Sequence, residues 1–195
     1  LAQQQKNMCG ADAVYLGYTA FGARSYAGNF DADGLRDAVA YAHERGKKIY
    51  VTVNTLVKQC ETDDLCDVLE LLGDVNVDAV LVQDMGVARI AQMRFPQLVL
   101  HASTQMTVME SRSALFLKSL GVCRIVPARE LSLEEIRLLK EQTGLAMEVF
   151  IHGALCYCYS GQCLFSSMIG GRSGNRGRCA QPCRLPFRRE DGERN

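Results

Sequence analysis

The sequence predicts an α/β protein that forms part of a (β/α)8 TIM-like barrel with parallel strands, and three observations support this fold class. Six short runs rich in Val, Ile and Leu alternate with helix-like stretches along the chain. The runs are mostly apolar, as expected for strands buried on both faces of a parallel sheet. No GxGxxG or GxxxxGKS/T sequence follows any run, which weighs against the alternative of an open, doubly wound nucleotide-binding sheet.

Each strand is expected where apolar and β-branched residues cluster between turn residues. The six predicted strands cover residues 13–17, 48–53, 78–83, 98–101, 124–127 and 147–151. A first helix is expected from Asp33 to Gly46, because apolar residues recur on one of its faces. The next helices are expected over 61–73, 86–94, 109–119 and 133–142. Ser132 and Glu135 form a capping box at the start of the last one.

The predicted barrel is incomplete, because six strands are two short of eight. The chain begins without Met, in a helix-like stretch that stops at Gly10, and it finishes in a polar tail. We therefore expect a barrel truncated at both ends. Residues 1–151 are expected to form the barrel, and residues 152–195, rich in Cys, Arg and Gly, to pack on the barrel mouth within the same domain.

The overall charge gives no electrostatic case for nucleic-acid binding, since 22 basic residues balance 22 acidic ones. Six arginines nevertheless crowd the C-terminal segment: Arg172, Arg176, Arg178, Arg184, Arg188 and Arg189. Such a run can hold phosphates, and it can equally be a solvated loop beside negatively charged thiolates. With no run of about 18 apolar residues and no signal peptide, we expect no membrane span and a cytoplasmic location.

Polar residues gather where the predicted strands end, and in a barrel these ends converge on the face that carries the active site. The residues expected to converge are Asn54, Gln83, His101, Gln105, Arg129, Glu148 and His152. Among them His101, Gln105, Arg129 and His152 are the catalytic candidates, and Asn54 and Gln83 are candidates for substrate binding. The alternative is that these are ordinary loop residues and helix caps, and that His101 is a histidine bonded in the core.

Five of the nine cysteines lie between residues 156 and 183: Cys156, Cys158, Cys163, Cys179 and Cys183. Thiolates gathered in a Gly- and Ser-rich segment suit a soft metal or an iron–sulfur cluster, and disulfides or plain buried thiols are the alternatives. A structural zinc site is a weaker match, because the gaps of six and fifteen residues differ from CxxC spacing. The other cysteines are interpreted as ordinary thiols.

A peptidase is the competing function class. The sequence has no HExxH pair for a metal and no GxSxG turn for a serine nucleophile. Cys156 with His152 or His101 can form a Cys–His pair, but this requires a free thiol at a position better explained as a metal ligand.

The segment from Glu148 to Arg184 resembles the signature of the U32 "peptidase" family. It contains EVFIHGALC, then YSGQC, then GGRSGNRGRCAQPCR. Further similarity lies in GADAVYLG, YVTVNT, VQD, HASTQ and ARE upstream. Within the family, the sequence is most similar to the branch linked to cytidine hydroxylation in bacterial 23S ribosomal RNA.

This resemblance implies a barrel-based enzyme that hydroxylates rRNA or tRNA, with prephenate as the oxygen source and a [4Fe–4S] cluster as cofactor. It implies Cys156, Cys163 and Cys179 as cluster ligands, with Cys183 or a cysteine beyond this chain as the fourth and Cys158 as a bystander. Arg172 and Arg176 are then expected to hold phosphate or the carboxylates of prephenate. The alternative within the family is a collagenase-like peptidase.

Overall fold

The computed structural model describes residues 10–153 and 155–187, and these contain one six-stranded parallel sheet. The strands are β1 (Ala13–Gly17), β2 (Lys48–Val53), β3 (Ala79–Val82), β4 (Leu100–Ala102), β5 (Val122–Ile125) and β6 (Ala146–Met147). They lie in the sheet in chain order, each parallel to the next. Parallel strands that follow one another in chain order, each joined by a helix, are the topology of a barrel wall, so the predicted fold class is confirmed.

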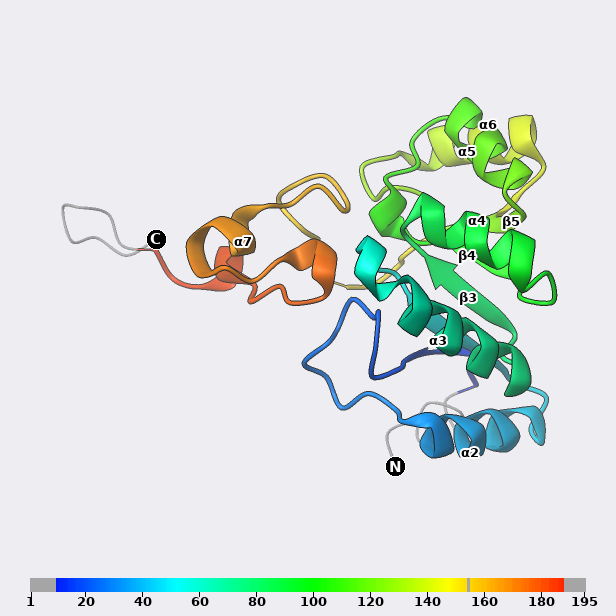
Figure 1. The fold of residues 1–195 in the computed structure, drawn as a ribbon. Coiled ribbons are helices and arrows are strands. Elements are labelled where there is room, and N and C mark those ends of the chain that lie inside the picture. Colours follow the sequence, from blue (N-terminus) through cyan, green and yellow to red (C-terminus); the bar gives the residue numbers. More distant parts are fainter. Residues whose placement is uncertain (1–9, 154, 188–195) are drawn as a thin grey trace.

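Five helices cover the outer face of the sheet (Figure 1). They are α2 (Ala32–His43), α3 (Thr62–Asp74), α4 (Met85–Arg94), α5 (Ser111–Ser119) and α6 (Leu133–Thr143). The predicted capping box at the start of α6 is present, since Ser132 and Glu135 exchange hydrogen bonds. Short 3₁₀ turns, η1 (Gln59–Glu61) and η2 (Thr104–Met106), follow β2 and β4. None of the helices in the described part of the chain has the length and apolarity that a membrane crossing needs.

Two apolar clusters occupy the two faces of the sheet, because successive strand residues point to opposite sides. The larger cluster joins the outward residues, such as Val51 and Val80, to the helices. The smaller one contains Tyr50, Ala79, Leu81 and Val126 and lies on the concave inner face. Most of the hydrophobic core therefore lies between the sheet and the helices, and the inner face of the sheet is left available for a functional site.

The last strand is shorter than predicted. β6 ends at Met147, whereas the sequence suggested a strand to residue 151. Glu148 still donates its backbone N–H to Ile125, but Phe150 is 64% and Ile151 97% exposed. Among the described residues no further strand pairs with the free edge of β6, so these apolar residues have nothing to pack against.

The remaining described segment, 152–153 and 155–187, lies at the side to which the strands point (yellow to red in Figure 1). It contains only the short helix α7 (Phe165–Gly170) and the turns η3 (Gly174–Arg176) and η4 (Pro182–Arg184). The predicted N-terminal helix, Cys9, and Arg188 and Arg189 in the polar tail lie outside the described residues.

Candidate active site at the barrel mouth

The Cys-rich segment is attached to the barrel mouth at two places, and the first is Ser160–Gln162. Ser160 is 1% exposed; its backbone N–H and its hydroxyl both donate to the Glu130 carboxylate, at 3.1 and 3.2 Å. Its carbonyl accepts from the Thr107 hydroxyl at 2.5 Å, and Gln162 donates to the same hydroxyl at 2.9 Å. This anchor therefore ties the segment to the loops that follow β4 and β5.

The second anchor is Asn175–Gly177, which contacts the loops after β1 and β2. Leu56 donates its backbone N–H to the carbonyl of Asn175 at 3.0 Å, and Ser25 donates to that of Gly177 at 3.1 Å. Arg176 forms a two-pronged ion pair with Glu61, with one contact at 2.7 Å. This guanidinium lowers the pKa of Glu61 to about 2, so the pair is charged at neutral pH.

A glycine sits at each anchor because the backbone passes too close for a side chain. Gly161 has φ +76°, and a Cβ there would lie 2.2 Å from the carbonyl oxygen of Gln105. Gly177 has φ +73°, and its Cβ would lie 2.3 Å from the oxygen of Gly22. Glycine is thus required at both positions for two reasons: the backbone is left-handed there, and a neighbouring backbone lies too close for a Cβ atom.

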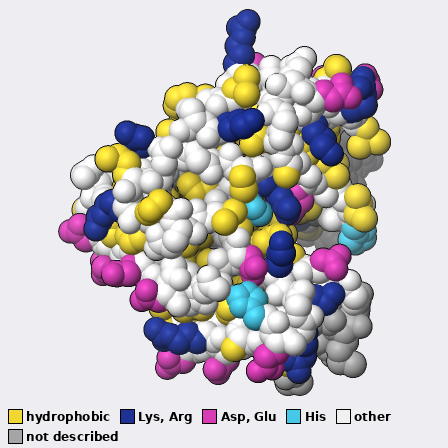
Figure 2. Space-filling view, turned by 90° about the vertical axis from the view of Figure 1, so that its right-hand side faces the viewer, with side chains coloured by type: hydrophobic (Ala, Val, Ile, Leu, Met, Phe, Trp, Pro, Cys, Tyr) yellow, Lys and Arg dark blue, Asp and Glu magenta, His cyan; other side chains and the backbone are white. Residues whose placement is uncertain are grey.

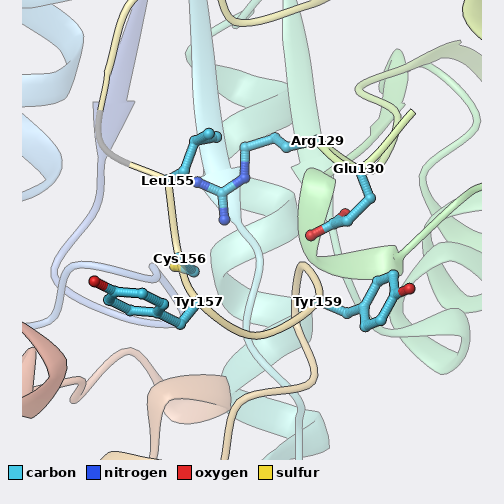
Figure 3. A pocket seen from close by; sticks show the side chains of 6 residues that line it. All are labelled: Arg129, Glu130, Leu155, Cys156, Tyr157 and Tyr159. Atoms are coloured by element: carbon cyan, nitrogen blue, oxygen red, sulfur yellow. The ribbon is translucent and has the colours of Figure 1, made fainter. Parts of the chain in front are cut away.

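Between the segment and the loop after β5 lies a pocket of about 420 Å³, which we call the thiol pocket. Its lining residues are Arg129, Glu130, Leu155, Cys156, Tyr157 and Tyr159. The Arg129 guanidinium and the Glu130 carboxylate point toward the same space, and Cys156 lies on the facing loop (Figure 3). A cation, an anion and a thiol therefore meet at the mouth of the barrel.

A larger pocket of about 660 Å³, which we call the amide pocket, lies above the ends of β3 and β4. Four of its lining residues carry side-chain amides: Gln83, Gln105, Gln162 and Asn175. Gln162 directly precedes Cys163, so one lining residue of this pocket is the chain neighbour of a predicted cluster ligand.

Inside the barrel, ionisable and aromatic side chains form a group that we call the interior cluster: Tyr15, Tyr50, His101, Arg124 and Glu148. Arg124 pairs with Glu148 at 3.0 Å, and the Tyr15 hydroxyl donates to the same carboxylate. The rings of Tyr50 and His101 meet edge to face with centroids 5.0 Å apart. Basic, acidic and histidine side chains also gather in the central hollow of the face shown in Figure 2.

Within this cluster, burial and the nearby charges of Arg124 and Lys48 lower the pKa of His101 to about 4. The imidazole is therefore neutral at pH 7. Its Nδ1 atom has no hydrogen-bond partner among the described residues, so it is not the satisfied core histidine of the alternative interpretation. Burial raises the pKa of Glu148 despite its pairing with Arg124.

The five clustered cysteines are free thiols on exposed or half-buried positions. A hydrogen bond and charge from Cys163, followed by charges from Cys156 and Cys183, raise the pKa of Cys158. The Cys158 thiol thus lies near three of the predicted ligands, and its role as a bystander stays a prediction. Within residues 10–153 and 155–187, no three His, Cys, Asp or Glu side chains are arranged to hold a metal ion.

The other predicted site residues divide into two groups. Asn54 is buried at the mouth, where it accepts from the Ala23 N–H at 2.9 Å and donates to Ser103 at 3.2 Å. His152 and Arg172 are exposed, and the Arg172 side chain forms no hydrogen bond or ion pair with the described part of the chain. Their roles, and a role for Arg176 in substrate binding, stay predictions.

Sequence reasoning missed the residues that assemble the mouth. Ser160 and Glu130 form one anchor, Glu61 holds Arg176 in the other, and Tyr15, Tyr50 and Arg124 build the interior cluster. A signal existed for the interior residues: Tyr15 and Tyr50 each stand in an apolar run at positions that alternate with the helix-facing residues. No comparable signal marked Glu61, which looked like the start of a helix.

The chain is similar to proteins that are named for two kinds of function, RNA hydroxylation and proteolysis. It is 45% identical to the 23S rRNA 5-hydroxycytidine C2501 synthase of Escherichia coli, over 94% of this chain and 28% of that protein. It is 41% identical to the tRNA hydroxylation protein P1 of Bacillus subtilis, over 91% of this chain and 42% of that protein. It is 29% identical to a collagenase of Porphyromonas gingivalis, over 93% of this chain and 46% of that protein. The chain thus spans less than half the length of each of these relatives.

The fold and the family agree with these similarities. A solved U32 peptidase superposes with a TM-score of 0.63 at 22% identity, covering 75% of this chain and 62% of that one, which supports the shared fold. The family model described as "Peptidase family U32" matches residues 4–195. The chain therefore belongs to peptidase family U32.

Proposed function

We propose that this chain is part of a cytoplasmic, iron–sulfur-dependent enzyme that hydroxylates rRNA or tRNA and takes its oxygen from prephenate. The relatives at 34–45% identity that are named for RNA hydroxylation support the reaction class. The observation that carries the proposal is the thiol pocket, in which Arg129 faces Cys156 across the barrel mouth. A protease would need a nucleophile and a base there, and among the described residues no histidine lines this pocket.

The donor set suits a [4Fe–4S] cluster, because the five thiols of this segment are not paired in disulfides and lie on loops or a short turn. Cys156, Cys163, Cys179 and Cys183 would hold it, and when bound it supplies one-electron transfer at the barrel mouth. Binding requires these side chains to turn toward one another from their present arrangement. Zinc is the alternative occupant, and it would give the site a structural role.

The residues around the pocket suit a small dicarboxylate. Guanidinium groups bind carboxylates with two parallel hydrogen bonds, and Arg129 already points into the pocket. Arg172, exposed on the loop after α7, offers a second cation for prephenate or for RNA phosphate. Burial lowers the pKa of His101, so its imidazole is neutral in the barrel interior and is available there as a hydrogen-bond or proton acceptor.

Complementation tests the reaction. In an Escherichia coli strain that lacks its 23S rRNA 5-hydroxycytidine C2501 synthase, the intact protein should restore 5-hydroxycytidine, measured by mass spectrometry of rRNA nucleosides. Restoration should require prephenate synthesis. No hydroxylated nucleoside in rRNA or tRNA, together with cleavage of gelatin by the purified protein, would replace this proposal by the peptidase alternative.

Anaerobic purification tests the cofactor. The intact protein should contain iron and sulfide, and Cys163→Ser should abolish the visible absorbance of the cluster. Cys158→Ser is the matched control and should retain it. Equal loss in both variants would assign Cys158 to the ligand set, and zinc without sulfide would contradict the cluster.

A further inference from the structure

Two residues that line the amide pocket, Gln83 and Gln105, carry hydrogen-bond acceptors that no described residue satisfies. Gln83 follows β3 directly and is only 7% exposed, and its Oε1 atom has no hydrogen-bond partner among the described residues. The Oε1 atom of Gln105, from the turn after β4, is buried and unpartnered as well. Buried polar atoms are nearly always hydrogen-bonded, so two such oxygens on residues that line one pocket point to a ligand that brings donors.

The rest of the pocket suits a flat, partly apolar ligand. Met85 is 58% and Phe116 54% exposed, and both line the pocket together with Met106. Exposed Met and Phe side chains provide faces on which a planar ring can stack. Arg112, on the exposed first turn of α5, adds a cation at the rim.

We propose that the amide pocket binds a single nucleobase turned out of the RNA, through an exocyclic amino group. This inference rests on the proposed function and specifies where its substrate binds. An amino group such as that of cytosine has two N–H donors, which can satisfy the oxygens of Gln83 and Gln105 together. The base stacks on the Met and Phe side chains, and Arg112 lies where the flanking phosphate leaves the pocket.

The same chemistry disfavours the other pyrimidine. Uracil has one donor, N3–H, on the corresponding edge and carries an oxygen where cytosine carries its amino group. With the two amides oriented as in the structure, that oxygen would face the buried carbonyl oxygens, and at least one of them would stay unpaired. Sites built around buried polar groups reject analogues that lack the matching group.

Photocrosslinking with the intact protein tests the inference. The probe is an RNA of the sequence around C2501 of 23S rRNA with 5-bromocytidine at the target position, which retains the amino group and crosslinks under ultraviolet light. Mass spectrometry should find the crosslink on Met85 or within residues 105–117. The same RNA with 5-bromouridine should crosslink about fivefold less or weaker still.

Variants link the crosslink to the amides. Gln83→Met keeps the length of the side chain and removes its polar group, and it should lower the 5-bromocytidine crosslink by about fivefold or more. Gln142→Met, an exposed amide on α6, is the matched control and should leave it unchanged. Because Gln83 is buried, a second variant, Arg112→Ala on the surface, should lower the yield without any change in thermal melting.

Three outcomes would overturn the inference. A crosslink confined to the thiol pocket, or an undiminished yield in Gln83→Met, would remove the base from the amide pocket and leave RNA hydroxylation standing. Equal crosslinking of the two bases would remove the role of the amino group. No crosslink and no hydroxylated RNA, with a photoreactive gelatin peptide labelling Met85 instead, would reject the proposed function along with the pocket assignment.

Discussion

At the scale of single residues, the interior cluster holds a histidine in an unusual state. His101 is 4% exposed, next to Arg124, and the pKa of its imidazole lies near 4 rather than at 6.5. A buried site that already contains Arg124 disfavours a second positive charge. Keeping this imidazole neutral costs the folded barrel no free energy at a pH where His101 is also neutral in the unfolded chain. At lower pH the unfolded chain gains a proton that the folded barrel excludes.

This gives a pH dependence of stability. Between pH 6.5 and 4 the unfolded chain binds a proton on His101 that the folded protein does not, so the free energy of unfolding should fall as pH falls through this window. The slope from this residue is at most about 1.4 kcal/mol per pH unit. Urea unfolding at several pH values measures it.

His101→Gln should flatten that slope, because glutamine does not titrate. His43→Gln is the matched control: His43 lies on α2, outside the barrel, and pairs with Asp78 at 2.9 Å. Identical slopes in wild type and His101→Gln would show that the imidazole is protonated in the folded state.

The sequence allowed the mouth residues to be predicted only in part. The positions of Asn54 and Gln83 at the mouth could be predicted because strand ends in a parallel sheet share one side, whereas His101 lies inside the barrel against Tyr50. The orientation of the Arg176 side chain could not be predicted, since Glu61 lies 115 positions away in the chain and only the folded barrel brings the two together.

At the scale of elements, the Cys-rich segment is held by a few contacts and not by regular structure. Among residues 155–187 the only α-helix is the six-residue α7, and the anchors Ser160–Gln162 and Asn175–Gly177 supply most of the bonds to the barrel. Regions with few buried contacts open locally without global unfolding. A mutation in one anchor should therefore loosen that anchor without detaching the other.

Removing the ion pair tests the second anchor. Arg176→Ala should raise the exchange rates of the Leu56 and Ser25 amide hydrogens by about tenfold, because both are donated to this anchor. Hydrogen exchange read by NMR or mass spectrometry measures this, with Val51 in β2 as an internal reference. Arg137→Ala, which breaks an exposed pair on α6, should change none of these rates. Unchanged exchange in Arg176→Ala would mean that the backbone bonds alone hold the anchor.

Adding one methyl group tests the first anchor. Gly161→Ala should detach Ser160–Gln162 and make the segment more sensitive to limited proteolysis, since the new Cβ would collide with the Gln105 backbone. Gly171→Ala has the same left-handed strain, about 1 kcal/mol, but open space around its Cβ. Equal proteolysis of the two variants would attribute the effect to strain and not to the close approach.

The end of β6 shows where element prediction from sequence fails. Residues 148–151 have strand-like composition, yet the strand stops at Met147. A strand at the edge of a sheet is held on one side only, and composition does not reveal which strand lies at an edge.

At the scale of the whole molecule, the alternation of strands and helices sufficed to predict the sheet and its order. The packing of the C-terminal segment could not be derived in this way, because its contacts follow no periodic pattern. Its resemblance to a family supplied the candidate ligands, and the physical reasons for its glycines appeared only with the close approaches at Gly161 and Gly177.

The 195-residue chain should self-associate when it is produced alone. In the described part of the chain the outer edges of β1 and β6 have no partner strand, and Phe150 and Ile151 expose apolar surface beside β6. Light scattering coupled to size exclusion should show oligomers, and the double variant Phe150→Ser, Ile151→Ser should reduce them. Leu133→Ser, at a leucine that is 81% exposed on α6, is the control and should not. A monomeric wild-type chain would contradict this prediction.

The way the segment is docked also sets an order of folding. The loops that receive it follow β1, β2, β4 and β5, so the docking surface exists only once nearly the entire sheet has formed. Contacts between residues more than 100 positions apart, such as Glu61 with Arg176, close late because a long loop must first be ordered. The backbone amides of Leu56 and Ser25, which donate to the segment, therefore gain protection from hydrogen exchange only when the barrel is complete, and their protection in a refolding experiment would serve as a clock for its final step.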